Sequence, residues 1–144
     1  MRLYLDVCCL CRKFDDASQL MVAAEADAVR QIMEAGFTLL AGEMVRDELL
    51  EMPGEERRAE VLETVGRFAV QTEITGEIER RAVLLTGLGF GVQDAVHIAS
   101  AEAAGADWLL STDQRLVSRG QRLAHLLKVK IDNPRDWWLR WPST

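Results

Sequence analysis

Long apolar runs are missing from this sequence. No segment reaches the roughly 20 consecutive apolar residues that a transmembrane helix needs. The N-terminus also lacks the basic stretch followed by an apolar one that marks a signal peptide. We therefore expect a cytoplasmic protein with no membrane association. Repeats, low-complexity tracts and linkers are absent as well, so a chain of 144 residues is expected to form a single core.

Cysteine and histidine are scarce. The three cysteines, Cys8, Cys9 and Cys11, lie within four residues of one another, and the two histidines are His97 and His125. A zinc site needs a second set of ligands at matching spacing, and an odd number of cysteines argues against a disulfide framework. We expect the thiols to be small, partly buried side chains after a strand, and not the reactive groups of the protein.

Basic residues are outnumbered by acidic ones. The chain has 17 Lys and Arg against 23 Asp and Glu, which gives a formal net charge of −6. Because most nucleic-acid-binding proteins are basic, this balance argues weakly against a nucleic-acid partner. It does not exclude such a partner, since an acidic site that binds divalent cations can change its local charge from negative to positive.

Short apolar strands alternate with helical patterns along the chain. Strands are predicted at residues 3–5, 37–40, 107–112 and 128–131. Helices are predicted at residues 18–35, 43–52, 55–68, 75–88, 92–104 and 114–127. Residues 69–73 are ambiguous. Continuously apolar strands separated by helices are typical of an α/β fold, with a parallel sheet covered on both faces.

Four acids follow this pattern in a way that brings them to one place. Asp6 ends the first strand, and Asp113 follows the strand at 107–112. Glu48 lies in the helix after the second strand, and Asp94 lies near the start of the helix at 92–104. Since ligand sites in parallel sheets form outside the carboxyl ends of the strands, we expect these side chains to meet there.

Acids gathered in this way imply a bound cation. Four neighbouring carboxylates repel unless some are protonated or a cation holds them. Oxygen ligands without thiols or a histidine cluster favour Mg²⁺ or Mn²⁺, which can activate a water for phosphodiester hydrolysis. Each acid also has a structural alternative. Asp6 is able to accept loop N–H groups, Asp94 to interact with a helix dipole, Asp113 to cap a helix, and Glu48 to be a solvated helix acid.

Four segments in order, "LYLDVCCL", "EMVRDEL", "QDAVHIASA" and "WLLSTDQRL", resemble the PIN-domain family of metal-dependent ribonucleases. That family includes the VapC-type toxins of toxin–antitoxin pairs. The resemblance implies a three-layer α/β/α sandwich with a short parallel sheet, formed by a nuclease domain over residues 1–132. It also implies hydrolysis of RNA and an antitoxin partner. A homodimer is a further possibility.

The resemblance assigns roles to the acids. It implies that Asp6, Glu48, Asp94 and Asp113 form the catalytic set. Asp6, Asp94 and Asp113 would bind Mg²⁺ or Mn²⁺ directly or through water, while Glu48 would orient a metal-bound water or act as a base. Ser111 stands where the family often has threonine, and its hydroxyl is expected to hydrogen-bond an acid or such a water.

Other residues near these motifs are open to more than one interpretation. Cys8 departs from the Asn, Ser or Thr that many members carry two residues after the first acid. His97 is more simply a histidine satisfied by a neighbouring helix than a ligand or proton carrier. Arg12, Lys13 and Arg115 are candidates for contacts with RNA phosphates. A non-catalytic module that binds RNA or a protein through the same pocket is the alternative function.

The C-terminal segment, residues 133–144, is rich in tryptophan and arginine. Its residues of these types are Trp137, Trp138, Trp141, Arg135 and Arg140. We expect it to pack on its own domain. The second interpretation is that the segment forms a surface for a homodimer or an antitoxin. The third is that it forms a platform on which unpaired bases stack.

Overall fold

The computed structural model describes residues 1–142, which form a five-stranded, wholly parallel sheet in the order β3-β2-β1-β4-β5. The strands are β1 (Arg2–Leu5), β2 (Thr38–Gly42), β3 (Val70–Thr72), β4 (Trp108–Leu110) and β5 (Lys130–Asp132). The predicted α/β class with a parallel sheet is therefore confirmed. The ambiguous residues 69–73 contain the edge strand β3.

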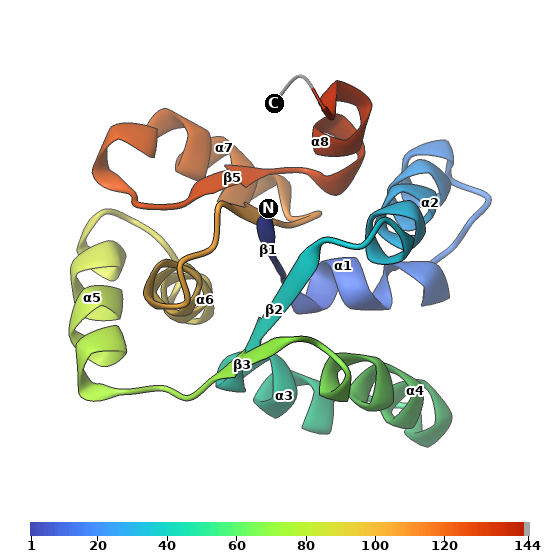
Figure 1. Cartoon of the computed structure of the whole chain (residues 1–144), viewed down its shortest axis with the longest axis horizontal. Helices are drawn as coiled ribbons and strands as arrows, with labels where there is room; N and C mark the ends of the chain where they lie inside the picture. The colour runs from blue at the N-terminus through green and yellow to red at the C-terminus, as the bar shows by residue number, and fades with distance from the viewer. Residues whose placement is uncertain (143–144) are drawn as a thin grey trace.

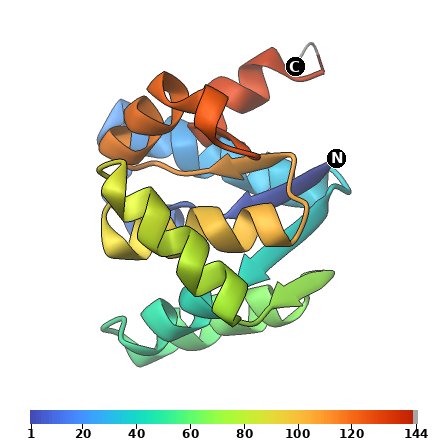
Figure 2. The same cartoon turned by 90° about the vertical axis from the view of Figure 1, so that its left-hand side faces the viewer.

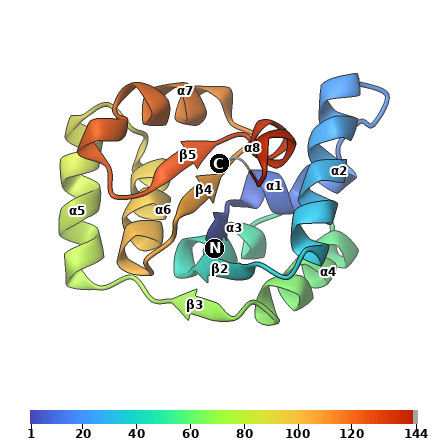
Figure 3. The same ribbon diagram turned by 45° about the horizontal axis from the view of Figure 1, so that its top comes forward.

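Helices cover both faces of the sheet (Figure 1). The helices are α1 (Val7–Cys11), α2 (Leu20–Glu34), α3 (Glu43–Leu50), α4 (Glu55–Gly66), α5 (Gly76–Gly87), α6 (Val92–Ala103), α7 (Gln114–Arg122) and α8 (Pro134–Arg140). Two 3₁₀ turns, η1 (Arg12–Phe14) and η2 (Ala124–Leu126), complete the elements. Helices α5 and α6 lie in front of the sheet in Figure 2, whereas α1, α2 and α8 lie on its other side in Figure 3. The molecule therefore has three layers, α/β/α.

The central strand β1 organises both the core and the functional edge. Leu3, Tyr4 and Leu5 are completely buried, because strands lie on both sides of β1 and helices cover both of its faces. The chain crosses from β3 at one edge to β4 on the other side of β1 through α5 and α6. The connections from β1 and β4 thus diverge at their carboxyl ends, which is the place where sites form in open parallel sheets.

Several helix boundaries differ from the prediction, and two of them have a clear cause. Helix α2 begins at Leu20 rather than Ser18, because the Ser18 amide and hydroxyl both donate to Asp16 Oδ1, at 3.0 and 2.7 Å. Ser18 therefore closes a turn before the helix and does not cap it. Helix α7 ends at Arg122 instead of reaching residue 127, since Leu123 leaves the helical conformation and the 3₁₀ turn η2 follows.

The tryptophan-rich segment folds back on the protein. Trp137 is completely buried in the core, where its ring meets Phe37 and Trp108 edge to face and stacks on Trp141. Trp138 Nε1 donates to Gln31 of α2 at 3.0 Å. The predicted boundary at residue 132 stays a prediction, and residues 143 and 144 of that segment lie outside the described part of the chain. Within residues 1–142, no helix is long and apolar enough to cross a membrane.

Candidate active site

Asp6 lies at the carboxyl end of the central strand and begins helix α1. Its Oδ1 accepts a hydrogen bond from the Cys9 amide at 3.0 Å, so the predicted acceptance of nearby N–H groups takes the form of a cap on α1. The residue is only 4% exposed. Burial raises the pKa of Asp6, against the opposing effects of the Ser111 hydroxyl and His97.

Asp113 occupies the equivalent place after the neighbouring strand β4 and caps α7. Its Oδ1 accepts from the amides of Arg115 and Leu116, at 2.9 and 3.3 Å. Its own amide donates to the fully buried Ser111 hydroxyl at 3.0 Å. Capping engages one carboxylate oxygen, which leaves Oδ2 without a donor among residues 1–142.

Asp94 joins this edge from the first turn of α6. Burial and, after it, the negative charges of Asp113, Asp6 and Glu48 raise its pKa to about 6, while His97 opposes the change. Charges influence one another to this extent only when they are close. The other three predicted acids therefore lie within electrostatic range of Asp94, and we call Asp6, Glu48, Asp94 and Asp113 the acidic cluster.

Glu48 reaches the cluster from α3 and is held by a histidine. Its Oε1 lies 2.7 Å from Nε2 of His97, and the Glu48 side chain is 22% exposed. The other ring nitrogen of His97, Nδ1, lies 2.7 Å from the hydroxyl of Tyr4 in β1. His97 is thus satisfied by neighbouring elements, as the sequence predicted. The part of Tyr4 was missed, because a tyrosine in an apolar strand gives no sign that its hydroxyl has a buried partner.

The thiols stand around the cluster without forming a site of their own. Cys8 lies at the surface, and its pKa is raised to about 12 by desolvation and by the negative charges of Asp6 and Asp113. The buried Cys9 donates its S–H to the Leu110 carbonyl at a sulfur–oxygen distance of 3.2 Å. A thiol with a raised pKa stays protonated near neutral pH and is a poor nucleophile. This agrees with the expectation that the cysteines are not the reactive groups of the protein.

The donor set of the acidic cluster fits a hard divalent cation. Within the described chain, no Lys or Arg forms an ion pair with Asp6, Asp94 or Asp113. Burial opposes the charged form of Asp6 and Asp94, and a cation would reverse that effect. No three His, Cys, Asp or Glu side chains of residues 1–142 stand close enough to hold a metal as they are. The carboxylates are therefore neighbours without being a preformed cage.

The predicted RNA contacts fall into two groups. Arg12 donates to Glu25 Oε1 at 2.9 and 2.8 Å and to Asp15 at 3.1 Å, while Lys13 pairs with an acid on α4 at 2.9 Å. Both basic groups thus have carboxylate partners within the chain. Arg115 is exposed in the first turn of α7, two residues after Asp113, so it stands beside the cluster. Roles of these residues in RNA binding stay predictions.

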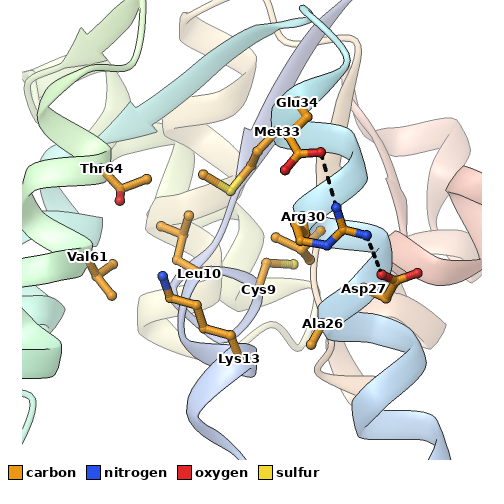
Figure 4. A pocket seen from close by; sticks show the side chains of 11 residues that line it. Cys9, Leu10, Lys13, Ala26, Asp27, Arg30, Met33, Glu34, Val61 and Thr64 are labelled. Atoms are coloured by element: carbon orange, nitrogen blue, oxygen red, sulfur yellow. Dashed lines mark hydrogen bonds and ion pairs between the residues drawn. The ribbon is translucent and has the colours of Figure 1, made fainter.

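A groove lies on the face of the sheet that α2 covers. It has a volume of about 560 Å³ and runs between α2 and α4, with α1 at its base (Figure 4). Apolar side chains line its interior: Leu10, Val29, Met33 and Val61. Charged residues of both signs stand at its rim, where Arg30 forms ion pairs with Asp27 and Glu34.

Comparison with known proteins identifies the fold. No family model and no curated protein matches the chain. A toxin–antitoxin complex from Klebsiella pneumoniae matches with a TM-score of 0.65 and 15% identity, over 92% of this chain and 97% of that one. VapC20 of Mycobacterium tuberculosis, a toxin that cleaves the sarcin–ricin loop, has a TM-score of 0.63 and 12% identity, over 82% and 95%. VapBC-1 from nontypeable Haemophilus influenzae has a TM-score of 0.60 and 16% identity, over 93% and 98%. The chain therefore has the fold of the VapC toxins, which confirms the predicted PIN-like α/β/α architecture.

Proposed function

We propose that this chain is a metal-dependent endoribonuclease of the PIN-domain, VapC type, and that it is the toxin of a toxin–antitoxin pair. One observation carries the proposal: Asp6, Asp94 and Asp113, which form no ion pair with Lys or Arg in residues 1–142, lie near one another and near the His97-bound Glu48 at the carboxyl edge of the sheet, on a fold shared with VapC toxins. An uncompensated acidic cluster is unfavourable by itself and becomes favourable when it holds Mg²⁺ or Mn²⁺.

The residues divide the work of such a site. Asp6, Asp94 and Asp113 would hold the cation, which when bound neutralises charge on the scissile phosphate and activates a water. Ser111 fixes the turn that presents Asp113, through the hydrogen bond from the Asp113 amide. Glu48, steadied by His97, is placed to accept a proton or to orient a water. Arg115, which is exposed two residues after Asp113, would offer a positive charge to a phosphate of the substrate.

Incubation of the purified protein with RNA, with Mn²⁺ or with EDTA, tests the proposal. We expect cleavage with Mn²⁺ that leaves 5′-phosphate ends and that EDTA stops. Asp6→Asn and Asp94→Asn should abolish cleavage and keep the fold, since an asparagine oxygen at position 6 still caps α1. Asp47→Asn, which changes an exposed acid beside Glu48, is the matched control and should remain active. Full metal-dependent activity in both cluster variants would refute the assignment.

The groove between α2 and α4 is the surface that we propose for the antitoxin. Its interior is apolar, and its rim offers both signs of charge. This combination suits an apolar segment of a partner protein that is flanked by charged side chains. Several of the structures with this fold are toxin–antitoxin complexes. A homodimer stays a prediction.

A non-catalytic module is the second candidate function. It is favoured by the absence of a ready three-residue metal site in residues 1–142. Such a module would bind RNA or a protein at the same edge and would show no turnover with any divalent cation. RNA retention on the immobilised protein without strand cleavage, in Mn²⁺ as well as in Mg²⁺, would select this alternative.

A further inference from the structure

Three polar side chains from three different elements are linked by two hydrogen bonds into a buried series that ends at the acidic cluster. Tyr4 comes from β1, His97 from α6 and Glu48 from α3. The Tyr4 hydroxyl lies 2.7 Å from His97 Nδ1, and His97 Nε2 lies 2.7 Å from Glu48 Oε1. Tyr4 is completely buried and His97 is 3% exposed. Most polar groups this deeply buried have a hydrogen-bond partner, because an unpaired donor in the interior is costly.

The direction of each hydrogen bond follows from this requirement. The Tyr4 hydroxyl carries one hydrogen to donate, and because Tyr4 is completely buried, that hydrogen needs an acceptor within the protein. The acceptor that it reaches is His97 Nδ1. A ring nitrogen that accepts carries no proton, so the imidazole proton sits on Nε2 and is donated to Glu48. A doubly protonated ring would leave the Tyr4 hydrogen without an acceptor in a buried site.

Glycine is required at position 42 for this arrangement. A Cβ atom there would lie 2.8 Å from the Tyr4 oxygen and 3.2 Å from Ser100 Cβ, and the first of these distances is too short for two non-bonded atoms. Gly42 is also the residue at which β2 turns into α3, the helix that carries Glu48. The backbone of Gly42 therefore lies against the Tyr4 hydroxyl and also begins the helix that carries Glu48.

We infer that His97 is a positioning residue: Tyr4 fixes the ring as the tautomer with its proton on Nε2, and that proton orients the Glu48 carboxylate at the acidic cluster. The inference rests on the proposed function for its effect on catalysis, but the tautomer is a property of the metal-free protein. Engagement of Oε1 by His97 leaves Oε2 of Glu48 as the oxygen available to a water or a proton. Partners that orient the groups of a metal site in this way commonly change affinity or activity by about 10- to 100-fold.

The tautomer is tested by ¹⁵N–¹H correlation spectra of the imidazole groups in the full chain, labelled at histidine and kept in EDTA at pH 7.5. We expect the His97 resonances of a neutral ring with its proton on Nε2, identified by their loss in His97→Gln. Tyr4→Phe removes the hydrogen donated to Nδ1, so the spectrum should shift toward a mixture of tautomers. A wild-type ring that carries its proton on Nδ1, or that already samples both tautomers, overturns the inference.

The positioning role is tested by single-turnover RNA cleavage in Mn²⁺. His97→Leu removes the donor to Glu48 and should lower the cleavage rate at saturating RNA by about 10- to 100-fold, with little change in the RNA concentration for half-maximal rate. His97→Gln keeps an N–H group and should recover part of the rate. The matched control is Ser100→Ala, which removes a buried hydroxyl one turn along α6 that has no partner in the described chain. Thermal unfolding of each variant checks that it is folded.

The two proposals fail in different ways. If wild type does not cleave RNA with any divalent cation, the proposed function fails, and the spectra alone still decide the inferred tautomer. If wild type cleaves RNA and Asp6→Asn does not, but His97→Leu cleaves as fast as Ser100→Ala, the positioning role of His97 is wrong while the proposed function stands.

Discussion

Asp94 lies in the first turn of α6 and Asp113 caps α7, and after burial the charge of Asp113 does most to raise the pKa of Asp94. The two helices are joined through the buried strand β4, and Asp113 follows the carboxyl end of that strand. Their repulsion is one part of the unfavourable charge of the acidic cluster. The metal-free protein therefore holds electrostatic strain that a cation would relieve.

This strain predicts an unusual pH dependence for the metal-free protein. The pKa of Asp94 rises from 3.8 to about 6 on folding, so the folded state holds a proton that the unfolded state has lost between these values. The contribution of Asp94 to stability is thus fully present below pH 4 and is lost as the pH rises to about 6. Asp94→Asn removes this loss and should be more stable than wild type above pH 6, by on the order of 1 kcal/mol after allowance for solvent screening of a half-exposed group.

Urea denaturation in EDTA at a series of pH values measures this difference. The curves for Asp94→Asn and wild type should coincide near pH 4 and separate between pH 4 and 6. A constant difference across that range would show that the Asp94 carboxylate is not destabilised by its neighbours.

Addition of Mn²⁺ should stabilise the wild-type protein. A ligand that binds only the folded state adds about 2.7 kcal/mol at a free concentration 100 times its Kd, which is a rise of several degrees in Tm for a chain of this size. Asp6→Asn should lose the rise, because it removes a buried carboxylate charge, whereas Asp47→Asn should keep it. Differential scanning fluorimetry with Mn²⁺ and then with excess EDTA gives the measurement. An equal rise in the Tm of Asp6→Asn would show that the metal binds away from the central strand.

A good part of this site was predictable from the sequence, since it depends on where apolar runs stop. Asp6 and Asp113 follow short buried strands, and parallel strands end at one edge, so their meeting follows from the pattern of the chain. The edge strand β3 was ambiguous because Val70–Thr72 is short and contains the polar Gln71. An exposed edge strand lacks the continuous apolar character that marks the central ones.

The pairing of side chains from distant segments was beyond the reach of sequence patterns. Arg12 stays a candidate for contact with a phosphate, and the structure shows that it also lies against Glu25, which is buried in α2. Nothing in the spacing of the two residues distinguishes that carboxylate from the exposed acids of the same helix. The contact of Tyr4 with His97 depends in the same way on a packing of β1 against α6 that only the folded chain has.

Gly42→Ala should destabilise the protein. The added Cβ would lie 2.8 Å from the Tyr4 oxygen, and overpacking of this kind typically costs about 1–3 kcal/mol. Gly66→Ala, at the last residue of α4, is the matched control, because nothing lies within 4 Å of its added Cβ. It should be neutral or stabilising by up to about 1 kcal/mol. Chemical denaturation of the two variants under one set of conditions makes the comparison, and equal effects would mean that the space around Gly42 is not tight.

A charge placed in the groove between α2 and α4 should weaken binding of the antitoxin and leave RNA cleavage intact. Ala26→Arg puts a long charged side chain into the groove, where burial against an apolar partner is unfavourable. We expect the affinity for the antitoxin to fall by about tenfold or more, which corresponds to about 1.4 kcal/mol. Met21→Arg adds the same charge to an exposed position of α2 outside the groove and should bind as wild type does. The binding partner for calorimetry is the product of a small reading frame adjacent to the gene. If both arginine variants bind it as tightly as wild type, the antitoxin sits elsewhere.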